Sequence, residues 1–298
     1  MKTLREVLVN AAARHVAVGH FNISELAALK GIFEAAQEFS QSKKTLVPIL
    51  IGVSEGEREF IGVRQVVELV RSLREEYDYP IFLNADHTHS LEKVHEAAAA
   101  GFDEILFDGS ALPMEENIRQ TAAAVRIVRG INPRIIVEGE IGFIGSSSEI
   151  VAERPPASFM LSTTDEAAQF VKKTGVDVLA PAVGNMHGLL AKMVSGEEHK
   201  RLDIPRIAAI KRAITTAKCQ FMTLHGGSGT ADEDFKAAIA AGMTIIHVSS
   251  ELRLAWRRGV EAGLAANAQE IAPYKILPPA VEGIKKVVED RLKLFNGA

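Results

Sequence analysis

The chain alternates, almost without interruption, between short apolar runs and longer stretches whose apolar residues recur every three or four positions. The short runs predict buried strands, and the longer stretches predict amphipathic helices. Eight strand–helix units in about 250 residues predict one (β/α)8 TIM barrel of the α/β class. A doubly wound open sheet is the alternative, but no strand leads into a GxGxxG turn. The strands are predicted at 16–22, 45–53, 81–86, 104–108, 135–140, 176–183, 221–225 and 244–249.

The helices predicted between these strands give a single domain over residues 1–298. A further helix at 3–14 precedes the first strand, and a helical extension at 280–295 ends the chain. The helices of the repeating units are predicted at 25–39, 57–77, 91–100, 115–129, 165–174, 204–216, 232–241 and 251–266.

Composition excludes several classes of protein. The 298 residues are 47% apolar and 24% charged, with a net charge of −4 and no basic run interleaved with aromatics, so a nucleic-acid partner is not expected. Charges at Lys2 and Arg5 interrupt the start of the chain, and no apolar run is long enough to span a bilayer, so we expect a cytoplasmic protein. Cys219 is the only cysteine, so a bound metal would need histidine and carboxylate ligands.

Polar side chains collect where the predicted strands end, which is the face where TIM barrels carry their sites. Because this pattern recurs on nearly every strand, packing alone does not explain it, and the sequence predicts a site at this rim. The residues at or just after the strand ends are His20, Asn22, Ser54, Asp86, His87, Asp108, Glu138, Glu140, His187, His225, His247, Ser249 and Ser250.

Three of these residues, His87, His187 and His225, follow strands three, six and seven. Three neutral imidazoles with an open coordination position are a recurrent way to hold catalytic Zn²⁺. Ligands from distant strands have no fixed spacing, so three hydrogen-bonded loop histidines are the alternative. Asp86 lies beside His87 and suits a proton-transfer group next to a metal ligand.

A glycine-rich turn, HGGSG, begins at His225 and leads to a helix that is predicted to start near Thr230. Glycines let backbone amides approach an anion, and a helix N-terminus favours negative charge. The position after strand seven therefore predicts a phosphate site, with an ordinary tight turn as the alternative.

The pair His87 and His89 also fits the HxH signature of an amidohydrolase-type hydrolase. That pair belongs on the first barrel strand, with an aspartate at the end of the eighth, whereas here it follows strand three and strand eight carries His247. We therefore expect His89 to precede the next helix, beside Ser90.

Seven segments in order resemble the class II, metal-dependent fructose-bisphosphate aldolase family, which also contains tagatose-bisphosphate aldolases. The resemblance spans about residues 18–251. The segments are VGHFNISEL, PILIGVSEGE, Asp86-His87, GFDEILFDGSALPMEENI, VEGEIGFIG, TGVDVLAPAVGNMHG and LHGGSG.

The resemblance implies a role for each segment. His87, His187 and His225 would hold a catalytic Zn²⁺, which acts as a Lewis acid on the ketone of dihydroxyacetone phosphate and stabilises its enediolate. Asp86 would move the proton at the C4 oxygen of the sugar. Asp108 and Glu140 match secondary metal positions, which leaves room for a second divalent or a monovalent cation. The substrate positions implied are Asn22, Ser54, Gly188, Gly226, Gly227, Ser228, Ser249 and Ser250.

The departures from the family pattern lie on the substrate side. His247 replaces a family asparagine and is assigned to the substrate, and His20 stands where a small or different residue is usual. Because strands one and eight are neighbours in a closed barrel, we expect the two histidines to face each other across the rim. The family's GGxED loop reads Gly-Ser-Ser-Ser-Glu at 145–149, which makes Glu149 the expected carboxylate for enediolate formation. The segment between His187 and Asp203 is also longer than usual.

These features predict a zinc-dependent ketose-bisphosphate aldolase whose substrate is fructose 1,6-bisphosphate or a close ketose phosphate. A metal-dependent sugar-phosphate epimerase and a non-catalytic sugar-phosphate-binding protein are the alternatives. The resemblance also implies a homo-oligomer, a dimer or a tetramer.

Overall fold

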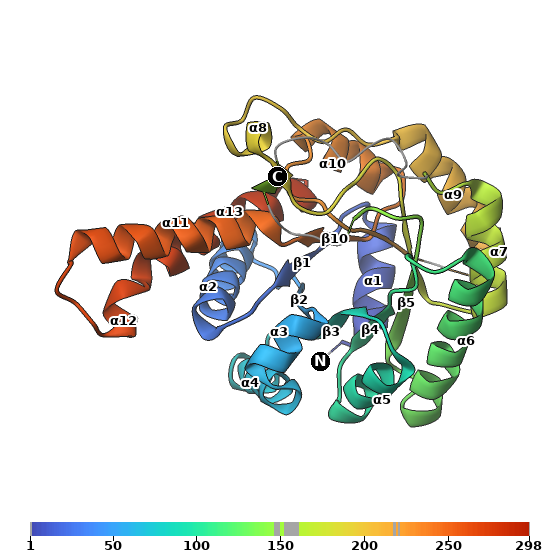
Figure 1. Ribbon diagram of the computed structural model, residues 1–298, viewed down its shortest axis with the longest axis horizontal. Helices are drawn as coiled ribbons and strands as arrows, with labels where there is room; N and C mark the ends of the chain where they lie inside the picture. Colours follow the sequence, from blue (N-terminus) through green and yellow to red (C-terminus); the bar gives the residue numbers. More distant parts are fainter. Residues whose placement is uncertain (1, 146–149, 152–160, 217–218, 220, 298) are drawn as a thin grey trace.

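Eight parallel strands close into a barrel in the order β1-β10-β9-β7-β5-β4-β3-β2, with helices packed around it (Figure 1). The computed structural model describes residues 2–145, 150–151, 161–216, 219 and 221–297. The predicted (β/α)8 TIM barrel is confirmed. Its strands are β1 (Val18–Asn22), β2 (Ile49–Val53), β3 (Ile81–Thr88), β4 (Glu104–Phe107), β5 (Ile136–Ile141), β7 (Val178–Pro181), β9 (Phe221–Leu224) and β10 (Ile245–Val248).

The helices follow the prediction with one break. The helix predicted over 57–77 is two helices, because Gly62 between them has φ +98°, a conformation that no helix contains. The helices are α1 (Leu4–Ala13), α2 (Leu26–Lys43), α3 (Glu55–Ile61), α4 (Val63–Tyr77), α5 (Leu91–Ala100), α6 (Met114–Ile131), α7 (Thr164–Thr174), α8 (Ala191–Val194), α9 (Ile204–Thr216), α10 (Asp232–Ala240), α11 (Ser250–Ala266), α12 (Pro273–Ile276) and α13 (Pro278–Phe295).

Helix α1 closes the end of the barrel where the strands begin. Its buried residues Leu4, Val7 and Leu8 form one cluster with the first apolar residues of the strands, including Val18 and Leu50. Burial of these side chains removes apolar surface from water and covers the barrel interior at this end. The opposite end, where the strands finish, is the end at which TIM barrels carry their sites.

Two features lie outside the repeating units. A short ladder pairs β6 (Ile150–Val151) with β8 (Leu189–Leu190) in the segments that follow β5 and β7, and the sequence did not predict it. Helices α11 and α12 extend away from the barrel beside α13 (Figure 1). No helix among the described residues is both long and apolar enough to cross a membrane.

Gly52 on β2 makes room for the buried ring of His20. A Cβ at Gly52 would lie 2.0 Å from His20 Cε1 and 2.4 Å from its Nε2. We expect Gly52→Ala to lower the free energy of unfolding in urea by about 1–3 kcal/mol, because an added methyl overpacks the barrel. The matched control is Gly130→Ala in α6, where nothing lies within 4 Å of the added Cβ. Equal stability of the two variants would contradict this account.

Candidate active site

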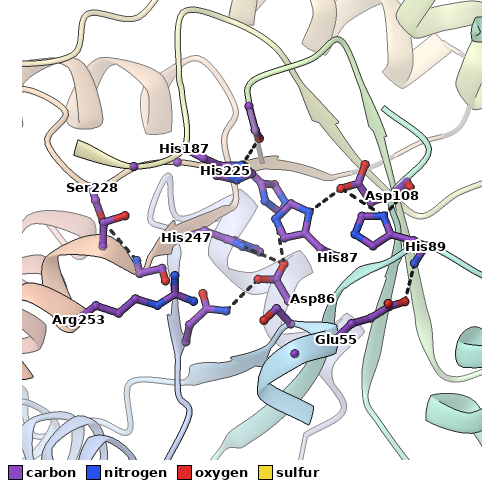
Figure 2. Close-up of a pocket in the computed structure, with 18 residues that line it drawn as sticks. Glu55, Asp86, His87, His89, Asp108, His187, His225, Ser228, His247 and Arg253 are labelled. Atoms are coloured by element: carbon purple, nitrogen blue, oxygen red, sulfur yellow. Dashed lines mark hydrogen bonds and ion pairs between the residues drawn. The ribbon is translucent and has the colours of Figure 1, made fainter. Parts of the chain in front are cut away.

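A bulge in β3 directs two neighbouring side chains toward the same cavity. The strand continues to Thr88, two residues past its predicted end, and its register with β4 shifts between Ala85 and Thr88. His87 has φ +45°, in the left-handed region that few residues other than glycine adopt. Neighbours on a regular strand point to opposite faces, but the bulge lets Asp86 and His87 point the same way (Figure 2).

The cavity at this end of the barrel has a volume of about 540 Å³, which suits a small-molecule ligand. Three residues that are predicted to have a catalytic, metal or substrate role are not among the described residues that line this cavity. Glu140 is buried behind His87, Gly227 donates its amide to the carbonyl oxygen of His247 (3.0 Å), and Glu149 lies outside the described residues. The predicted residues in the wall are Asn22, Ser54, Asp86, His87, Asp108, His187, Gly188, His225, Gly226, Ser228, His247, Ser249 and Ser250.

The imidazoles of His87, His187 and His225 converge in this cavity (Figure 2). The ring centroid of His87 lies 4.9 Å from each of the other two, which are 6.0 Å apart. One ring nitrogen from each residue can be chosen so that the three atoms lie within 4.8 Å of one another. This spacing suits three ligands around one ion.

Each of these imidazoles has one ring nitrogen against an oxygen acceptor. His87 Nδ1 lies 2.7 Å from Asp108 Oδ2, His187 Nδ1 lies 2.6 Å from the carbonyl oxygen of Gly145, and His225 Nε2 lies 2.8 Å from Glu138 Oε1. Donation to that oxygen leaves the lone pair on the second nitrogen. The second nitrogen of His225, Nδ1, is buried and has no hydrogen-bond partner among the residues that the structure describes. Histidine ligands of metals are held in this way, so the donor set fits a metal.

The electrostatics around the triad favour a positive charge at His87. Burial alone would lower the pKa of His87, but the carboxylates of Asp86 and Asp108 raise it to about 10. Burial and the charge of His87 lower the pKa of His187 to about 3 and that of His225 to about 4, so these two rings are neutral. The same carboxylates would stabilise either a proton on His87 or a cation bound to it.

Asp108 and Glu140 lie on the far side of the His87 ring from Asp86. Glu140 Oε2 is 3.7 Å from His87 Nδ1 and has no hydrogen-bond partner among the described residues. Burial and the neighbouring Asp108 raise the pKa of Glu140 well above its ordinary value. The two carboxylates therefore lie together on the Nδ1 side of His87, with Asp108 in the cavity wall and Glu140 buried behind it.

Asp86 is buried, accepts a hydrogen bond from an amide and lies beside imidazoles. Its Oδ2 accepts a hydrogen bond from Asn22 Nδ2 (2.9 Å), and its Oδ1 lies 3.6 Å from His247 Nδ1. Burial would raise the pKa of Asp86, but the imidazoles of His87 and His20 hold it below its ordinary value. The group is therefore a carboxylate, which is the form that accepts a proton.

His20 and His247 stack face to face, as the sequence predicts. They are register partners on β1 and β10, and their rings are 3.4 Å apart and inclined by only 3°. Burial lowers the pKa of His20 to about 4 and that of His247 well below its ordinary value, so two neutral rings stack without charge repulsion. Parallel rings cannot both direct an in-plane lone pair at one ion between them, so this pair is not a second metal site.

The helix after the glycine-rich turn starts where it is predicted, but its first turn does not face the cavity. Helix α10 begins at Asp232 with Ala231 as its N-cap, and Asp232, Glu233 and Asp234 fill its first turn. None of these residues lines the cavity. The cavity instead meets the start of α11, through Ser249 and Ser250.

Ser228 joins the glycine-rich turn to the start of α11. Its Oγ accepts from the backbone amides of Ser249 and Glu251, at 3.2 Å each. A hydroxyl that accepts in this way keeps its own proton for donation to an anion. The arrangement places hydroxyls and a helix N-terminus where phosphate is commonly bound in TIM barrels.

Sequence comparison decides the family. The family described as "Fructose-bisphosphate aldolase class-II" matches residues 2–298. The chain belongs to this family. It is 31% identical over 304 residues to the fructose-bisphosphate aldolase of Geobacillus stearothermophilus, covering 99% of this chain and 97% of that protein. It is 32% identical over 298 residues to the fructose-bisphosphate aldolase of Staphylococcus aureus strain Mu50, covering 99% of this chain and 96% of that protein.

Solved structures agree with this assignment. The YdjI aldolase of Escherichia coli K12 superposes with a TM-score of 0.79 at 26% identity, covering 98% of this chain and 96% of that one. The fructose-bisphosphate aldolase of Campylobacter jejuni gives 0.78 at 19% identity over 98% and 94%, which supports the fold alone. The protein is therefore an aldehyde-lyase of a family that acts on phosphorylated sugars.

Several residues around the cavity of this aldolase were not assigned from the sequence. Arg253, one turn into α11, is the cation of the wall, with a 43% exposed side chain whose Nη2 donates to Glu57 (2.7 Å). Glu138 was recognised as a strand end, but its bond to His225 was not. The position of Arg253, just after the last strand of a barrel predicted to bind phosphate, could have identified it from the sequence as a residue of the site. The other unassigned wall residues are Glu55, Gly56, His89 and Gly145.

Proposed function

We propose that this aldolase catalyses the reversible cleavage of fructose 1,6-bisphosphate, or a close ketose phosphate, to dihydroxyacetone phosphate and an aldehyde such as glyceraldehyde 3-phosphate. The proposal includes zinc held by His87, His187 and His225. The observation that carries it is the convergence of three imidazoles, each with an acceptor on one ring nitrogen, beside the buried carboxylate of Asp86. The names of the two bacterial relatives support the substrate class.

The imidazoles of His87, His187 and His225 would hold the zinc, which would supply a Lewis acid for the ketone of the substrate. Asp86 takes the proton of the C4 hydroxyl as the C3–C4 bond breaks, and it returns that proton to the aldehyde oxygen in the condensation direction. Asn22 fixes the Asp86 carboxylate by donating to Oδ2, so that the other oxygen remains directed toward the cavity and His247.

The phosphate of the triose half is assigned to the wall formed by the two glycine loops and the start of α11. Gly188 and Gly226 allow close approach of a phosphate, and the hydroxyls of Ser228, Ser249 and Ser250 supply donors. The other half of the substrate then lies toward Asn22, Ser54 and Arg253. His247, between Asp86 and His225, contacts the middle of the substrate.

The test is zinc analysis of the purified protein, combined with release of triose phosphate from fructose 1,6-bisphosphate with and without a chelator. We expect bound zinc, triose release and loss of both in the chelator. Active protein without zinc would refute the metal assignment. Zinc-bound protein that isomerises a sugar phosphate without releasing triose would instead identify an epimerase, and binding without turnover would identify a binding protein.

A further inference from the structure

Lys200 is a buried cation that neither the metal nor the phosphate assignment uses. Its side chain is only 1% exposed, yet its ammonium lies among backbone oxygens. Nζ donates to the carbonyl oxygens of Met186 (2.7 Å), Gly188 (2.8 Å) and Gly226 (3.0 Å). An ammonium has three N–H donors, so these three acceptors can satisfy all of them.

The three carbonyls belong to the loops that form the site. Met186 and Gly188 flank the predicted ligand His187, and Gly226 follows the predicted ligand His225. The two loops touch, because a Cβ on Gly226 would lie 2.3 Å from the carbonyl oxygen of Met186. The ammonium therefore bonds to the backbone beside two metal ligands and beside the phosphate turn.

The backbone of Lys200 is fixed to the same turn from the other direction. Its amide donates to the carbonyl oxygen of Gly229 (2.8 Å), and its own carbonyl accepts from Ala231 (3.3 Å). Lys200 lies in the segment between His187 and Asp203. This segment brings a lysine from outside the barrel strands to the base of both loops.

Converging carbonyl oxygens present the negative ends of their dipoles to one point, which is unfavourable unless a cation lies there. Potassium ions are held by rings of such carbonyls in place of water. We propose that Lys200 is a tethered monovalent cation: its ammonium fills a carbonyl-lined cation site and so positions the His187 and Gly226 loops. It is a positioning residue, because it acts through the backbone and does not line the cavity.

Two variants separate the charge of Lys200 from its bulk. Lys200→Ala leaves space for an ion, whereas Lys200→Met fills the space of the side-chain stem without a charge. Thermal unfolding of the zinc-free proteins is measured in potassium chloride and in choline chloride at equal ionic strength. We expect potassium to raise the Tm of Lys200→Ala by a few degrees and to leave wild type and Lys200→Met unchanged. A Lys200→Ala protein that folds only in potassium would also support the proposal.

The same variants are then assayed with zinc, and this arm rests on the proposed function. In choline we expect kcat/KM of Lys200→Ala to fall about 10- to 100-fold, as for residues that orient metal ligands. Potassium or ammonium should restore most of it in Lys200→Ala but not in Lys200→Met. Wild type that needs potassium, or Lys200→Ala that is equally unstable or inactive in both salts, would overturn the proposal. Wild type that cleaves no ketose phosphate would refute the proposed function alone, since the unfolding arm still decides the role of Lys200.

Discussion

Replacing Asp86 with asparagine is expected to leave zinc bound and to lower kcat for ketose phosphate cleavage about 10²- to 10⁴-fold, the usual contribution of a positioned acid–base group. Asparagine keeps the shape and the oxygen that accepts from Asn22, so the cavity is preserved. It cannot take the C4 proton. The measurement is steady-state cleavage together with the zinc content of the same preparation.

The control for Asp86→Asn is Glu55→Gln, which neutralises another carboxylate of the cavity wall. Glu55 Oε1 accepts from the amide of His89 (2.8 Å), and we expect this change to alter kcat much less than the change at Asp86. Asp86→Ala serves as a second variant of the acid. If either Asp86 variant loses its zinc, Asp86 is a metal ligand and the assignment of the acid is wrong.

The fold and the location of the site could be predicted from the sequence because both depend on local patterns. Each strand has its own apolar run, and each strand end has its own polar residue, so closing the barrel brings these ends together. The pairing of His20 with His247 follows from the same closure, since β1 and β10 are neighbours only in a closed barrel. Counting strands therefore predicted a contact between residues more than 200 positions apart.

The backbone at His87 could not be predicted in this way. The predicted strand ends at Asp86, so a loop would have to direct both side chains into one cavity. The structure reaches the same result by a bulge within the strand, with His87 at φ +45°. A histidine tolerates that conformation better than most residues, but its position within a strand carries no signal of it. The break at Gly62 was missed for a similar reason, because glycine also occurs inside helices.

Contacts between a side chain and a distant segment of backbone also could not be predicted from the sequence. Lys200 bonds to carbonyl groups, which every residue has, so nothing in residues 186–188 or 226 indicates that a lysine will meet them. The prediction of a possible monovalent cation pointed to an ion and not to a side chain. The contact of Glu138 with His225 could more easily be inferred, because only β7 lies between β5 and β9 in the sheet order.

Replacing His225 with alanine is expected to abolish tight zinc binding and to lower kcat/KM by at least about 10³-fold, because a Lewis acid contributes several kcal/mol to the transition state. His225 is the most enclosed of the three imidazoles, and its Nδ1 has no hydrogen-bond partner within the described part of the chain. Zinc content by elemental analysis, paired with the cleavage assay, checks the result. The control is His89→Ala, which removes an exposed histidine of the same wall and should keep both zinc and activity.

Substitution of Glu138 tests the same zinc site without removing one of its predicted ligands. Glu138→Met removes the acceptor at His225 Nε2 while keeping the volume, and we expect zinc affinity to fall about 10- to 100-fold. Glu138→Gln retains a carbonyl oxygen at that position and should bind zinc nearly as tightly as wild type. If both variants weaken zinc equally, the charge of Glu138 matters and not its orientation of the ring. If neither does, His225 is held by the barrel alone, and the acceptor on its outer nitrogen is no argument for a metal ligand.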